Sequence, residues 1–319
     1  MLLRRSLAAL LLIAGMVVPA LGQDVTLKWE FKKDVPFFQE MKTDTKQTMK
    51  VMGMDVTQNQ SQTFIFSWTP KEQDAATKNW TIIQKIEAVK MEIEIAGNKI
   101  PYDSTKDAGG AGNPLADFFK SLVGSEFKLT ISPDMKVIKI EGKDDFITKL
   151  VKSNQQMEPI LKGILSEEAL KQMSDPAFAA IPGTPKKKGD SWDKKSTLNM
   201  GPIGSYDTTH KYTYEGKDDK KLDKIKVETS LTYQPPGANT VGSLPFKIKS
   251  AELKAKDATG TILFDNDKHR MESSNMTLNL VGKLTIDIGG MTSEVELNQQ
   301  QTTTVKTFDT NPVAPPKKP

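Results

Sequence analysis

Apolar and polar residues alternate along much of the chain, which is the pattern of strands that bury one face. In one such segment, Met91, Ile93 and Ile95 share a parity and charged residues stand between them. The same alternation occurs over residues 64–68, 206–214, 225–233 and 276–280. A period of two over this many segments is typical of half-buried antiparallel strands. The pattern therefore predicts a mainly β fold built from curved antiparallel sheets.

Short glycine turns join several of the predicted strands. Gly53, Gly97 and the pair Gly289 and Gly290 each stand between two alternating segments. Glycine readily adopts the positive φ that tight hairpin turns require. Each of these positions therefore predicts a hairpin.

Residues 113–175 break the alternation and predict a helical insert. Asn113 offers an N-cap, Pro114 a first helical residue and Gly124 a C-terminal stop for a short helix. Two short strands are predicted after it, over residues 127–131 and 137–140. Further helices follow, and the residues expected on their buried stripe are Phe146, Leu150, Ile160, Leu161, Leu165, Leu170 and Met173.

The chain divides at a proline- and lysine-rich stretch, residues 181–189, which is predicted to be a linker. A Lys-Lys pair and a turn followed by an aromatic residue open the segment before it and the segment after it. This similarity suggests two related β halves, residues 23–181 with the helical insert and residues 189–310. Common turn-to-strand entries are the alternative explanation. The tail, residues 311–319, is predicted to be disordered because it is rich in proline and lysine.

The first 22 residues have the parts of a secretory signal peptide. Arg4 and Arg5 precede an apolar stretch over residues 7–18, and small residues stand at Ala20 and Gly22. Cleavage is predicted between Gly22 and Gln23. The apolar stretch is too short to cross a bilayer, and no later segment is expected to span one. We therefore expect an exported protein, periplasmic or secreted.

Composition and charge exclude some kinds of chemical site and argue against one class of partner. The chain has no cysteine, which excludes disulfides and thiolate sites. Its formal net charge is +4, and its lysines alternate with acidic residues, so nucleic acid is not an expected partner.

The sequence offers no recognisable catalytic or metal site. His210 and His269 are the two histidines, and neither forms a zinc motif. His210 lies on a tyrosine-rich strand face and is predicted to be a packed or hydrogen-bonded sheet residue. The run from Asp265 resembles the start of a calcium loop, but Arg270 and Met276 stand where glycine and a bidentate glutamate are needed. We predict a protein that is not an enzyme and needs no cofactor.

Several short motifs resemble an uncharacterised family of exported bacterial proteins, defined only as a domain of unknown function. These motifs lie at residues 27–33, 113–119, 132–136, 189–192, 201–206 and 260–265. The resemblance implies no activity and no functional residue. At the level of architecture alone, long strands with packed helices resemble the half-barrels of periplasmic lipoprotein carriers.

Two hypotheses of different class follow. The first is a protein that binds or carries a lipid or another apolar small molecule, on a sheet partly covered by the helices. The candidate ligand-binding residues are Phe118, Phe119, Tyr206, His210 and Tyr212. The second is a structural component of the cell envelope that contacts other envelope proteins. An enzyme of unrecognised type is the third and least favoured.

Overall fold

The computed structural model describes residues 24–51, 53–95, 97–106, 116–152, 155, 158–174, 176–237 and 247–313. The predicted signal peptide with its cleavage site at Gly22 and Gln23 lies outside these residues, and so do the predicted helix start at Asn113 and Pro114 and most of the predicted tail.

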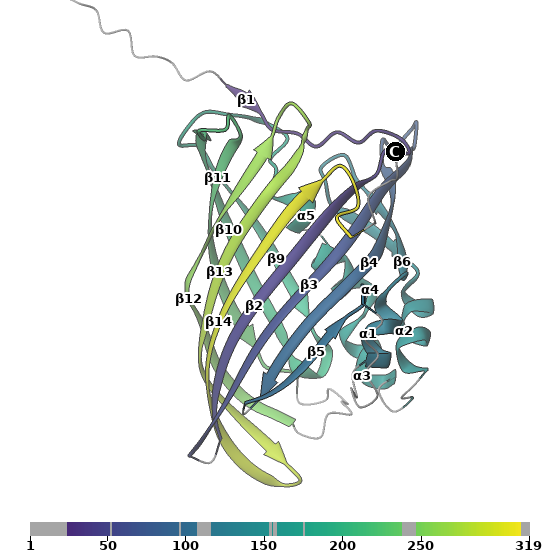
Figure 1. Cartoon of the computed structure of the whole chain (residues 1–319). Coiled ribbons are helices and arrows are strands. Elements are labelled where there is room, and N and C mark those ends of the chain that lie inside the picture. The colour runs from purple at the N-terminus through teal and green to yellow at the C-terminus, as the bar shows by residue number, and fades with distance from the viewer. Residues whose placement is uncertain are drawn as a thin grey trace, which may run out of the picture.

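Most of the described chain forms one antiparallel sheet of twelve strands. The strands before the linker are β2 (Phe37–Val51), β3 (Met54–Gln73), β4 (Trp80–Ile95), β5 (Asn98–Asp103), β6 (Glu126–Ile131) and β7 (Val137–Glu141). Those after it are β9 (Ser191–Asn199), β10 (Ser205–Lys217), β11 (Asp223–Gln234), β12 (Lys247–Asp265), β13 (Arg270–Ile288) and β14 (Met291–Phe308). The prediction of a mainly β fold with curved antiparallel pairing is confirmed (Figure 1).

Two meanders meet at the middle of this sheet. The strand order is β7-β6-β4-β3-β2-β14-β13-β12-β11-β10-β9, with β5 paired to β4. The two predicted halves are thus joined by β2 and β14, which pair from Phe38 opposite Phe308 to Val51 opposite Val295. The common origin of the halves stays a prediction.

The predicted glycine hairpins are present. Gly53, Gly97, Gly289 and Gly290 all have positive φ, between 59° and 92°. The β2–β3, β4–β5 and β13–β14 hairpins close at these glycines. The two-residue turns let long strands reverse without loosening their register, which keeps the sheet continuous.

Most of the helices gather on one side of the molecule, beside β4, β5 and β6 in Figure 1. The helices are α1 (Ala116–Leu122), α2 (Lys143–Val151), α3 (Glu158–Ile164), α4 (Glu167–Ser174) and α5 (Pro176–Ala179). Because α4 packs against both β7 and β9, the helical insert bridges the edge strands. The prediction that Met173 is buried is wrong: the buried side of this short helix is made by Ala169 and Leu170, and Met173 is exposed.

The predicted linker is held against the start of the described chain. Within it, β8 (Pro185–Lys186) pairs with β1 (Val25–Thr26). Ile181, at its beginning, is buried in the main core. The passage between the halves therefore has a defined course.

Candidate functional site

Aromatic rings pack together on the concave face at one end of the sheet. Trp29 lies 6.0 Å from Phe37 of β2 and 6.0 Å from Phe264 of β12, measured between ring centroids. Phe178 of α5 lies 5.2 Å from Trp68 of β3. Since strands this far apart in the sheet contact the same central rings, the sheet curls around them, and this end of the concave face is filled.

Away from the aromatic end, the concave face of the four central strands carries no charge. The register puts alternate residues of β2 (Phe37 to Val51), β3 (Met54 to Trp68), β13 (Ser274 to Ile288) and β14 (Met291 to Thr307) on this face. None of these residues is Asp, Glu, Lys, Arg or His. A charged side chain taken out of water without a partner is strongly unfavourable, so the central concave face suits an apolar environment.

The charged residues of the same strands stand on the convex face. Lys42 and Asp44 of β2 form a 2.8 Å ion pair there, and Lys283 of β13 pairs with Glu294 of β14 at 2.7 Å. The alternation thus separates a charged, solvated side from an uncharged side along the length of the sheet.

Polar but uncharged side chains cross the middle of the concave face. We call this set the glutamine belt, and its members are Gln47, Gln58, Gln60, Gln62, Gln299 and Gln301. All are half-buried. Gln60 Nε2 donates to Gln62 Oε1 at 3.1 Å, and the Gln58–Gln60 and Gln299–Gln301 contacts are 3.4 Å long. The two 3.4 Å contacts are long and weak, and each amide can make more hydrogen bonds than these, so the belt keeps capacity for another donor or acceptor.

Beside the belt lies a second apolar cluster, separate from the main core. Its buried members are Tyr233, Leu253 and Leu280. Half-buried residues pack around them, namely Tyr206, Leu231, Ala251, Leu284 and Leu297. Since these side chains keep part of their apolar surface in water, a ligand that covered them would gain from the hydrophobic effect.

Tyr206, His210 and Tyr212 lie together on the concave face of β10. The His210 Nδ1 atom and Thr229 Oγ1 are 2.9 Å apart, which confirms the prediction of a hydrogen-bonded sheet residue. Burial lowers the pKa of His210 and raises that of Tyr212 to about 12. Tyr206 packs on Tyr233 with ring centroids 5.1 Å apart, so it belongs to the second cluster.

Phe118 and Phe119 lie elsewhere, on α1. Phe119 packs on Tyr102 of β5 at 5.2 Å between ring centroids, and Phe118 lies 5.5 Å from Phe119. Among the described residues, no ring contact joins this pair to Tyr206, His210 or Tyr212. The five candidates therefore form two groups, of which the β10 group adjoins the central concave face.

The polar groups outside the four central strands make structural contacts. Asp223 is fully buried, accepts a 2.7 Å hydrogen bond from Tyr214 Oη and pairs with Lys217 at 3.1 Å. His269 ends the predicted polar turn between β12 and β13. Within the described ranges, no three His, Cys, Asp or Glu side chains are arranged to hold a metal ion.

Sequence reasoning overlooked the glutamine belt. Its signal is visible, because Gln58, Gln60 and Gln62 continue the parity of Phe64, Phe66 and Trp68. A run of glutamines in a strand is normally interpreted as a solvated face, so only the parity with the aromatic residues indicates the inner side.

None of the helices in the described part of the chain combines the length and the apolar character needed to span a bilayer.

Comparison with solved structures gives distant likenesses. A structure of lipovitellin, titled for its lipid–protein interactions, aligns with a TM-score of 0.46 and 12% identity over 91% of this chain and 26% of that chain. DynF from Micromonospora chersina aligns with a TM-score of 0.21 and 8% identity over 89% of this chain and 85% of its own. OccK5 from Pseudomonas aeruginosa has a TM-score of 0.26 and 6% identity, over 86% and 99% of the two chains. The chain thus spans about a quarter of the lipovitellin chain.

No curated protein matches the sequence. The prediction of an uncharacterised family is confirmed by a match over residues 77–311, a range that begins after β3. The chain belongs to the family of unknown function DUF6263.

Proposed function

We propose that this protein binds an apolar, chain-like molecule of the lipid class on the concave face of its sheet. One observation supports this most directly: the central concave face has no charged residue, yet many of its apolar side chains are only half-buried. A solid core would bury such residues fully, and a solvated face would carry charges.

The energetics favour such a ligand. Covering apolar surface is worth about 25 cal/mol per Å², so a few hundred Å² of newly buried surface amounts to several kcal/mol. No charged group of β2, β3, β13 or β14 on this face would have to be dehydrated.

The glutamine belt adds a preference within the lipid class. Its amide groups can donate to and accept from an uncharged polar group, such as a hydroxyl, an ester or an amide. A ligand with apolar chains and one such group would place the chains against Leu280 and Leu284 and the polar group against Gln299 and Gln301. Export to the periplasm or beyond would bring the protein to a compartment where free lipids need a carrier.

The test uses protein purified from its own host and measures co-purifying mass by native mass spectrometry and solvent extraction. Leu278 and Asn279 are neighbours on β13 that face opposite sides of the sheet, and both are half-buried. We expect Leu278→Lys to lose the bound lipid, because it puts a charge on the uncharged face. Asn279→Lys should retain it.

Two outcomes would sink the proposal. One is wild-type protein that carries no lipid from its host and takes up no fluorescent long-chain alcohol in solution. The other is equal retention by Leu278→Lys and Asn279→Lys when circular dichroism shows both to be folded, since the binding surface would then lie elsewhere.

A further inference from the structure

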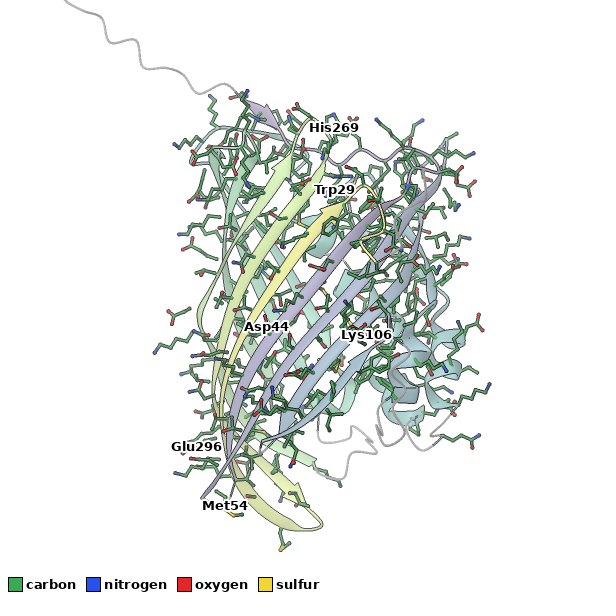
Figure 2. All side chains as sticks on the ribbon, in the orientation of Figure 1. Trp29, Asp44, Met54, Lys106, His269 and Glu296 are labelled. Carbon is green, nitrogen blue, oxygen red and sulfur yellow. The ribbon has the colours of Figure 1, made fainter. Side chains whose placement is uncertain are left out.

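Large apolar residues are exposed on the hairpin tips at one end of the sheet. Met54 opens β3 beside the β2–β3 turn, and Ile95 ends β4. Ile288 and Met291 flank the β13–β14 turn. Their exposed fractions are 68% for Met54, 41% for Ile95, 42% for Ile288 and 66% for Met291. Figure 1 shows the three hairpins reaching the same lower end of the molecule, and Figure 2 labels Met54 there.

These tips continue the concave face. Met54 pairs with Val51 and Ile95 with Gln58, and both pairs have the parity of the central concave residues. Ile288 has the parity of Leu284 and Ile286 on β13. The uncharged surface therefore runs without interruption from the glutamine belt to the exposed tips. It opens at the end of the sheet opposite the aromatic core.

The charges near the tips are largely paired with one another. Lys99 lies 3.1 Å from Glu92, Lys249 lies 2.8 Å from Asp287, and Lys283 lies 2.7 Å from Glu294. Paired charges give this end little net attraction for an anionic partner. Whatever covers the tips would therefore be held mainly by apolar contact.

The tips fit a fluid apolar partner better than a protein. They belong to separate hairpins that the register staggers, since Ile95 of one tip pairs with Gln58, four residues along β3 from Met54. A protein interface needs a contiguous, closely packed patch, whereas lipid acyl chains accommodate each side chain separately.

We propose that this end of the sheet docks on a lipid bilayer by inserting Met54, Ile95, Ile288 and Met291. Lipid then passes between the bilayer and the concave face without crossing water. The passage of ligand rests on the proposed function, whereas the docking itself rests on the tips alone.

The test is flotation of the full chain with phosphatidylcholine vesicles in a density gradient. The double variant Met54→Glu with Met291→Glu should reduce the vesicle-bound fraction by about tenfold or more. Each substitution replaces an apolar side chain, whose transfer into the bilayer is favourable, with a carboxylate, whose transfer is unfavourable. The matched control, Val35→Glu with Met173→Glu, changes two residues that are 55% and 45% exposed away from the tips, and should float like the wild type. High salt should leave the wild-type fraction unchanged, because paired charges contribute little.

Equal flotation of the tip variant and the wild type would overturn the proposal, as would wild-type protein that does not float. Sedimentation of the same proteins decides a further case. If the wild type is a dimer that does not float and the tip variant is a monomer, the tips bind a second copy and the bilayer proposal is wrong.

The two proposals fail in different ways. Leu278→Lys should lose its ligand and still float, because Leu278 lies on the concave face away from the tips. The tip variant should keep ligand that it acquires during expression and exchange it slowly with vesicles. A wild type that floats but never carries lipid would reject the carrier function and leave the docking intact.

Discussion

At the residue scale, strand parity decides which side chains face the candidate site. His210 could be interpreted from the sequence alone. Its place on a tyrosine-rich strand face predicted a packed or hydrogen-bonded sheet residue, and its contact with Thr229 confirms this. Gln60 shows the limit. An amide is compatible with a solvated face and with an inner face, and only tertiary curvature decides between them.

The environment of His210 predicts a pH dependence of stability. Burial lowers its pKa below the ordinary value of 6.5, so the unfolded chain binds a proton more readily than the folded protein. The stabilisation is fully present above about pH 6.5 and is lost as the pH falls toward the lowered pKa. The free energy of unfolding of the wild type, measured with urea, should therefore decrease as the pH is lowered from 7.5 to 5.5.

The variant His210→Gln should show a shallower decline over that range, because it keeps a polar group near Thr229 but does not titrate. His269→Gln is the control for losing a histidine. Equal slopes for His210→Gln and the wild type would mean that another group causes the acid sensitivity.

At the scale of single elements, local chemistry predicted more than long-range pairing. The glycine hairpins and the strands over residues 127–131 and 137–140 follow from turn residues and alternation, and the structure has them as β6 and β7 within one residue at each end. The pairing of β2 with β14 does not follow from any local signal. It joins strands from opposite ends of the chain, and alternation alone does not specify a partner.

Glycines in the sheet are predicted to differ sharply in their tolerance of substitution. Gly282 of β13 has φ +153°, and a Cβ there would lie 1.9 Å from the Glu252 carbonyl oxygen on β12. Gly53 has φ +82° in a hairpin turn, with nothing within 4 Å of the same position. Gly282→Ala must therefore push two paired strands apart, whereas Gly53→Ala adds only backbone strain.

Chemical unfolding should show a loss of about 1–2 kcal/mol for Gly53→Ala and a clearly larger loss for Gly282→Ala. Similar losses for the two variants would indicate that β12 and β13 can separate here at little cost.

At the scale of the whole molecule, the sequence predicted the fold class but not how the sheet is assembled. Periodicity identified strands and a helical insert. Periodicity did not predict that α4 packs against both β7 and β9. This bridge between the two edges depends on contacts between segments that are distant in the chain. The uncharged concave face likewise exists only because the two meanders join at β2 and β14 and bring matching parities side by side.

This assembly makes the last strand decisive for folding. β14 pairs with β13 on one side and with β2 on the other, so it is the only direct strand connection between the two meanders in the described sheet. A chain ending at residue 290 would leave β2 and β13 with long unpaired edges, which favour aggregation over a cooperative fold. We expect it to be recovered as aggregate, or to unfold without a single sharp thermal transition by circular dichroism.

A chain ending at residue 313 keeps every strand and should melt like the full-length protein. If the shorter chain were soluble and melted in one transition at the wild-type temperature, each meander would have to be stable alone, and the joined concave surface would not be what holds the molecule together.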